Sequence, residues 1–165
     1  MMLKKQRKCA AFTLVELLMA LMVAAIVLTA AATMAEAMSR AKEANDQMSR
    51  NTAYLLQIQT RLSDLIMRAN VVVDGNNQYI ILQHKKKDGT SVNTKIKSND
   101  IDGSLEIYEW DVLTESYILA ENYTKCQLVK IADMSGGSLS SDTKGVTIQF
   151  TLTENETYQV CAALR

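Results

Sequence analysis

The chain has 165 residues, about the length of one domain, and its 18 basic and 18 acidic residues give no formal net charge. The charges among residues 1–11 are all basic, so the rest of the chain has a net charge of −4 and no field to attract nucleic acid. No catalytic triad, phosphate loop or zinc cluster is visible, and the single histidine, His84, argues against most enzyme classes.

The N-terminal third begins with a short basic segment, residues 1–11, followed by an apolar stretch. Every residue from Phe12 to Ala35 suits a membrane helix, and Leu17–Ala35 carries no charge. Because a bilayer core about 30 Å thick needs roughly 20 apolar helical residues, Leu17–Ala35 is long enough to span it. The basic residues ahead of this segment predict a cytoplasmic N-terminus and an extracytoplasmic body.

The helical pattern continues beyond the apolar stretch. Apolar residues recur every seven positions, and charged residues occupy the opposite face of residues 36–69. No glycine or proline interrupts Phe12–Ala69, so we predict one helix of about 58 residues. We expect its apolar stripe to form a core against a sheet, and a coiled-coil seam is the alternative. The stripe consists of Met34, Ala41, Met48, Leu55, Leu62 and Ala69.

Residues 70–165 read as a β-rich head. The last two segments alternate cleanly between apolar and polar residues, with Glu154–Glu156 as the turn, and predict a hairpin with one apolar face. We interpret Asn93–Gly103 as a loop or a weak edge strand. The predicted fold class is therefore α+β, an antiparallel sheet packed on the C-terminal half of the helix. The expected strands are Asn70–Asp74, Gln78–Gln83, Ser104–Trp110, Glu115–Leu119, Cys126–Ile131, Gly145–Thr153 and Thr157–Leu164.

The junction between the basic segment and the apolar stretch reads Ala-Phe-Thr-Leu-Val-Glu-Leu-Leu from Ala11 to Leu18. It resembles the prepilin peptidase site of type IV pilin-like proteins. The resemblance implies cleavage between Ala11 and Phe12, N-methylation of Phe12, and a role for Glu16 in filament assembly. It also implies no enzymatic activity, no cofactor and a single-pass location in the bacterial inner membrane. The implied partners are the peptidase, other pilins or pseudopilins, an assembly-platform membrane protein and the lipid bilayer.

The head and the closing Ala162–Arg165 segment are more similar to minor pilins and minor pseudopilins than to major ones. The nearest groups are the pilus-assembly W-like, type II secretion J-like and competence F-like proteins. Two departures stand out. Ala11 replaces the usual glycine before the cut, and Ala25 and Thr33 stand where major pilins often carry glycine and proline. We therefore expect a continuous helix and slower cleavage.

The position of Glu16 calls for a physical explanation. A carboxylate inside a membrane helix costs about 2.5–3.5 kcal/mol on insertion scales. Cleavage after Ala11 creates a positive α-amine on Phe12, four residues away on the same helical side. We interpret Glu16 as the partner of this amine, in its own chain or in a neighbouring subunit. The alternative is a glutamate that lies among the lipid headgroups without a partner.

A secretory signal peptide is the competing interpretation, with an Ala-x-Ala-like site at Ala35-Glu36-Ala37 and a mature start near Met38. The apolar stretch is longer than a typical signal core, and it contains Glu16. An uncleaved signal anchor is a further alternative. In either case the chain would be an extracytoplasmic β-rich binding protein.

Three further features leave alternatives open. Cys126 and Cys161 form a disulfide, as pilin heads often do near their C-terminus, or remain separate buried thiols. The lysine run Lys85–Lys87, with His84, Lys95 and Lys97 nearby, is a solvated surface or a DNA contact. Asn99–Gly103 and Asp74–Asn77 form turns or bind calcium, although neither has a complete calcium-loop pattern. We favour the surface and the turns.

Overall fold

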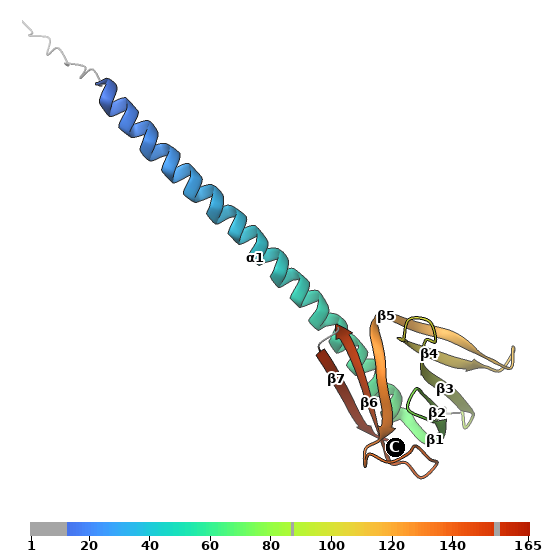
Figure 1. The fold of residues 1–165 in the computed structure, drawn as a ribbon. Helices are drawn as coiled ribbons and strands as arrows, with labels where there is room; N and C mark the ends of the chain where they lie inside the picture. Colours follow the sequence, from blue (N-terminus) through green and yellow to red (C-terminus); the bar gives the residue numbers. More distant parts are fainter. Residues whose placement is uncertain (1–12, 87, 154–155) are drawn as a thin grey trace, which may run out of the picture. The chain divides into compact units, whose positions relative to one another are not determined.

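The computed structural model describes residues 13–86, 88–153 and 156–165, and it contains one long helix and a seven-stranded sheet (Figure 1). Helix α1 runs from Leu14 to Arg68. The strands are β1 (Ala69–Gly75), β2 (Tyr79–Lys85), β3 (Ser91–Ser98), β4 (Ser104–Asp111), β5 (Ser116–Asp133), β6 (Gly145–Thr153) and β7 (Glu156–Ala163).

Helix α1 has 55 residues and confirms the long helix predicted from the sequence. It passes through Ala25 and Thr33 without a break, as expected from the absence of glycine and proline. The hydroxyls of Thr29 and Thr33 donate to the carbonyl oxygens of Ala25 (2.6 Å) and Ala30 (2.9 Å). These two polar side chains are therefore satisfied within the helix, which an apolar environment requires.

The chain divides into two compact units, the first ending at Arg50 and the second comprising Asn51–Arg165. In the first unit the helix exposes its apolar side chains, from Leu18 at 54% to Leu14 at 77%. By length and composition α1 can cross a membrane, and none of its most apolar window is buried within the chain. We call the second unit the head unit.

The sheet of the head unit is a meander. Each strand pairs antiparallel with its neighbour in the chain, in the order β1-β2-β3-β4-β5-β6-β7. The interpretation of Asn93–Gly103 as a loop or edge strand was wrong for its first half, because β3 lies inside the sheet between β2 and β4. Its Thr94 and Ile96 are 3% and 0% exposed on the face towards the helix, while lysines occupy the other face.

Strand β5 also departs from the expectation. Glu115–Leu119 and Cys126–Ile131 were expected to be separate strands, but they are parts of one strand of 18 residues. Its first part pairs with β4 and its last part with β6, and register shifts interrupt both pairings. Such irregularities bend a strand and increase its twist, so one strand can follow two partners.

The core lies between the last four turns of α1 and one face of the sheet. Ile58, Leu62 and Ile66 are fully buried there, together with Phe150 and Ile148 of β6. This confirms the predicted packing of the C-terminal hairpin's apolar face on the helix.

The apolar stripe of the helix is divided between core and surface. Leu62 and Ala69 are fully buried and Leu55 is partly buried, as a core requires. Met34 and Met48 are 68% and 71% exposed, so the core prediction was wrong for the N-terminal half of the stripe.

Polar contacts tie the helix and the chain end to the sheet. The Arg61 guanidinium contacts Glu121 of β5 at 2.7 Å and Glu109 of β4 at 3.8 Å. The Arg165 amide donates to the carbonyl oxygen of Ala69 at 2.9 Å, so the residue after the helix is held by the last residue of the chain. These contacts fix the end of α1 over the sheet.

The two cysteines of the head unit are free thiols, as in the second of the two alternatives, but only Cys126 is buried as that alternative expected. Cys126 is fully buried in the core on β5, whereas Cys161 is exposed on β7 and points to the opposite face. Strand β6 lies between β5 and β7, which keeps the two side chains apart. Burial raises the pKa of the Cys126 thiol to about 12.

Thiol labelling checks this arrangement. In a Cys9→Ser background, a thiol reagent is expected to react with Cys161 in the folded chain and with Cys126 only after unfolding. The single-cysteine variants Cys126→Ser and Cys161→Ser assign each reaction. A folded chain that reacts at neither position until a reductant is added would instead show a disulfide.

Candidate functional site

The N-terminus of α1 is held by reciprocal hydrogen bonds between Thr13 and Glu16. The Glu16 amide donates to Thr13 Oγ1 at 3.3 Å, and Glu16 Oε2 accepts from the Thr13 amide at 3.0 Å. The Thr13 hydroxyl also donates to Glu16 Oε2 at 3.1 Å. This is a capping box. The side chains of the residue before the helix and of a residue in its first turn accept from each other's amides, which have no partner inside the helix.

Sequence reasoning missed the role of Thr13. The signal was present, because Thr13-Leu14-Val15-Glu16 has the Thr-x-x-Glu spacing that precedes an apolar helix. Glu16 therefore accepts hydrogen bonds within its own chain, and whether it also pairs with a charged amine stays a prediction. A negative charge in the first turn also interacts favourably with the helix dipole.

The capping box leaves one oxygen of Glu16 available. Oε2 accepts both bonds from Thr13, and Oε1 has no hydrogen bond to any residue that the structure describes. The bonds from Thr13 hold the Glu16 carboxylate in the first turn of α1. The predicted cleavage residues, Ala11 and Phe12, lie outside the described residues.

The predicted membrane segment Leu17–Ala35 lies entirely within α1. It has no Asp, Glu, Lys or Arg side chain, and its large apolar side chains are exposed, including Leu21 at 61% and Ile26 at 66%. An exposed apolar surface of this length needs an apolar environment, from lipid or from other helices. Glu16 thus lies in the first turn of α1, immediately before this uncharged apolar segment.

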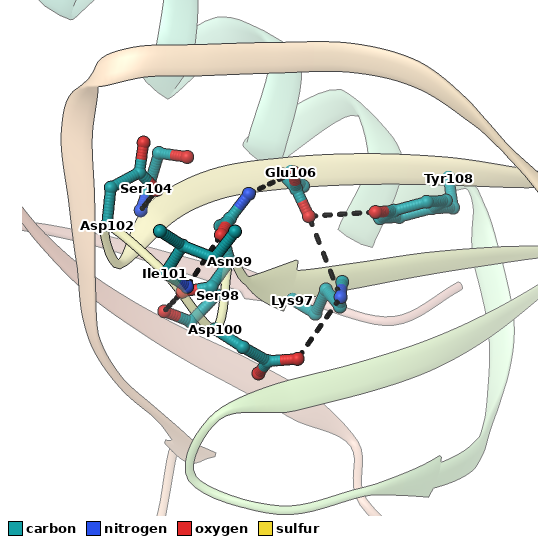
Figure 2. A network of polar contacts seen from close by, with 9 residues as sticks. All are labelled: Lys97, Ser98, Asn99, Asp100, Ile101, Asp102, Ser104, Glu106 and Tyr108. Atoms are coloured by element: carbon teal, nitrogen blue, oxygen red, sulfur yellow. Dashed lines mark hydrogen bonds and ion pairs between the residues drawn. The ribbon is translucent and has the colours of Figure 1, made fainter.

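The turn between β3 and β4, one of the two calcium candidates, is a closed network of polar contacts (Figure 2). Asn99 Oδ1 accepts from the Ile101 amide at 2.8 Å, and Asp102 Oδ1 accepts from the Ser104 amide at 2.9 Å. The second bond lowers the pKa of Asp102. Both oxygens therefore close the turn, as Asx turns do.

The same network surrounds Glu106, a carboxylate that is only 4% exposed. Asn99 Nδ2 donates to its Oε1 at 2.8 Å, and the Tyr108 hydroxyl donates to its Oε2 at 2.8 Å. Lys97 Nζ lies 3.7 Å from Glu106 and 3.9 Å from Asp100. Lysine thus supplies the positive charge that this buried carboxylate needs.

The second calcium candidate, Asp74–Asn77, is the turn between β1 and β2. Asp74 accepts from the Gly75 amide at 2.8 Å and from the Tyr79 hydroxyl at 2.7 Å. Asn76 Oδ1 accepts from the Gln78 amide at 2.7 Å. No group of three or more His, Cys, Asp or Glu side chains suited to a metal occurs among the residues the structure describes.

The described lysines of the predicted surface or DNA contact lie on two strands, β2 and β3, or just after β2. Lys85 and Lys86 are exposed at the end of β2, and Lys87 lies outside the described residues. Lys95 and Lys97 lie in the second half of β3, where their amines approach tyrosine rings. The lysines therefore belong to a hairpin end and to a sheet face.

Comparison with known proteins bears on the N-terminal site alone. A family model described as the prokaryotic N-terminal methylation motif matches residues 6–32, which include Ala11, Phe12, Thr13 and Glu16. No curated protein and no solved structure matches the chain. This motif is the N-terminal signature of type IV pilin-like proteins, and the long helix packed on an antiparallel sheet is a pilin-like α+β architecture.

Proposed function

We propose that the chain is a minor pilin or pseudopilin, cut by prepilin peptidase after Ala11, methylated on Phe12 and assembled through pairing of the Phe12 amine with Glu16. The observation that carries the proposal is the state of Glu16. Its Oε2 is fixed by Thr13, while its Oε1 has no partner within the described part of the chain. The carboxylate stands at the start of an otherwise uncharged apolar segment.

The proposed pairing depends on cleavage. Before the cut, the nitrogen of Phe12 is a neutral amide; afterwards it is a positive amine one residue before the capping box. An ion pair in an apolar environment requires good geometry to offset the loss of hydration. The capping box supplies that geometry because it orders the carboxylate before a partner arrives, which lowers the entropy lost on pairing. Pairing between subunits would then favour one axial register.

The proposed organisation follows the same segments. Residues 1–11 are the leader, which remains on the cytoplasmic side until cleavage. Residues 12–35 cross the membrane and later enter the filament core, and residues 36–69 and 70–165 form the amphipathic helix half and the extracytoplasmic head. The methylation motif implies processing by prepilin peptidase. Sibling pilins, an assembly-platform membrane protein and the bilayer are the other proposed partners.

The proposed role is to prime or cap a filament, or to adapt its surface, in a pilus, type II secretion or competence system. Support comes from the resemblance of the head to minor pilins and pseudopilins. The head unit presents a sheet and loops, and the described chain has neither a metal-suited cluster nor a sequence motif for catalysis. A structural subunit fits these features better than an enzyme does.

Mass spectrometry of the mature chain tests the proposal. We expect a chain that begins at Phe12 and carries one added methyl group on its amine. The Ala11→Gly variant restores the small residue usual at this position and is expected to be cut at the same bond, and faster. A mature chain that starts near Met38, or one that keeps residues 1–11, would contradict the proposal. Either result would instead support a secreted or signal-anchored binding protein.

A further inference from the structure

The face of the sheet turned away from the helix gathers aromatic and amide side chains. On β2 and β3, the residues Ile80, Leu82, Thr94 and Ile96 are buried towards the helix. Their chain neighbours therefore point to the opposite face, because side chains alternate along a strand. On β4, Tyr108 pairs with Lys95 and Trp110 pairs with Tyr117 of β5, so these three rings lie on the same face. We call this group the aromatic face; it consists of Tyr79, Gln83, Asn93, Lys95, Tyr108, Trp110 and Tyr117, and each member is partly exposed.

The rings of the aromatic face are held by contacts with one another. Trp110 and Tyr117 are paired across β4 and β5, with ring centroids 5.0 Å apart and an interplanar angle of 74°. Lys95 Nζ lies 5.1 Å from the centroid of the Tyr79 ring and 5.8 Å from that of Tyr117. Rings ordered in this way lose little side-chain entropy when a ligand packs on them.

Polar groups lie beside these rings. Gln83 and Asn93 are cross-strand partners, and Gln83 Nε2 donates to Asn93 Oδ1 at 3.4 Å. Lys95 has no carboxylate within ion-pair distance among the described residues, in contrast to Lys97, which faces Glu106 and Asp100. The aromatic face therefore combines stacking surfaces, amide hydrogen-bonding groups and one ammonium group without an anionic partner.

We propose that the aromatic face binds an oligosaccharide that carries one carboxylated sugar among neutral ones. The C–H faces of sugar rings pack on aromatic rings, and amide side chains donate to and accept from sugar hydroxyls. The Lys95 ammonium would bind the sugar carboxylate through charge-assisted hydrogen bonds. Ligand sites commonly combine apolar and aromatic surfaces with a few placed polar groups. This proposal is independent of the assembly mechanism.

The charge of the head unit distinguishes this ligand from nucleic acid. Aromatic rings beside lysines on a sheet also suit stacked bases. However, residues 51–165 include 11 basic and 14 acidic residues, a net charge of −3. A strand with a phosphate at every nucleotide gains affinity from many cations, which this surface lacks. A saccharide with a single carboxylate needs only one cation, which the Lys95 ammonium supplies. It also carries far less negative charge for the acidic head unit to repel.

Trp110 makes the test direct, because it is the only tryptophan of the chain and lies in the proposed site. The full-length chain is placed in phosphatidylcholine nanodiscs, which contain no sugar. Tryptophan fluorescence is then titrated with 3′-sialyllactose, with lactose, and with an oligothymidylate. We expect a saturable change with 3′-sialyllactose and at least about tenfold weaker binding of lactose. Saturation by the oligothymidylate and not by the saccharide would overturn the proposal.

Two variants locate the binding. Lys95→Met keeps the length of the side chain and removes its charge, so it is expected to reduce affinity for 3′-sialyllactose to about that for lactose. Lys130→Met, at an exposed position on β5 outside the aromatic face, is the matched control and is expected to bind like the natural chain. Tyr117→Ala should weaken both saccharides, with folding checked by thermal unfolding. No saturable response to 3′-sialyllactose, or equal binding by the Lys95→Met chain, would overturn the proposal.

Discussion

Replacement of Glu16 by glutamine is expected to leave helix α1 capped and to remove the mature chain from filaments. Glutamine can accept the hydrogen bonds from Thr13 that Glu16 Oε2 accepts, because Gln and Glu serve equally at this position of a capping box. It cannot pair with a charged amine. Removing one partner of a buried ion pair costs about 3–5 kcal/mol, which is more than a hundredfold in an association equilibrium.

The measurement compares the amount of the chain in sheared filaments with the amount in membranes, after mass spectrometry has shown that the cut at Phe12 is unchanged. Thr13→Ala is the matched control, because it removes the capping hydroxyl and keeps the charge. Loss of a cap costs about 1 kcal/mol, so this variant should enter filaments in reduced amounts. If the Glu16→Gln chain enters filaments normally, the charge of Glu16 is not needed for assembly.

Replacement of Leu62 by alanine is expected to be among the most damaging substitutions in the head unit. Leu62 is fully buried among the core residues of the sheet, and a buried Leu→Ala change costs about 2–5 kcal/mol through lost burial and the cavity it leaves. Since domains of this size are stable by only about 5–15 kcal/mol, the head unit would lose a large part of its stability.

Leu56 provides the control on the same helix, because its side chain is 56% exposed. The Leu56→Ala variant is expected to change the free energy of unfolding by less than about 0.5 kcal/mol. Urea unfolding followed by the fluorescence of Trp110 reports on the head unit, since that residue lies on β4. Equal losses in the two variants would show that Leu62 does not pack as described.

The features predicted correctly from the sequence are those with a strong period. The long helix follows from an apolar pattern without glycine or proline, and the hairpin of β6 and β7 follows from strict alternation. Strand β3 was missed because only Thr94 and Ile96 mark its buried face, beside Lys95 and Lys97 on the other. The continuity of β5 was missed because its register shifts interrupt the alternation that reveals a strand.

The candidate site was predicted in part. The sequence predicts that Glu16 needs a charged partner. The capping role of Thr13 was not predicted, although the Thr-x-x-Glu spacing indicates it. The cysteine pairing could not be judged from spacing. Whether Cys126 and Cys161 meet depends on the order of the strands, and β6 separates them.

The meander order of the sheet has a consequence for how the head matures. Each strand pairs with its immediate predecessor in the chain, so the hydrogen bonds of the sheet can form strand by strand. A chain that is threaded across a membrane, as we propose for this one, can therefore add one strand at a time as it emerges. The bond from the Arg165 amide to Ala69 forms only after β7 has paired, and it closes a long loop between the C-terminal strand and the end of α1.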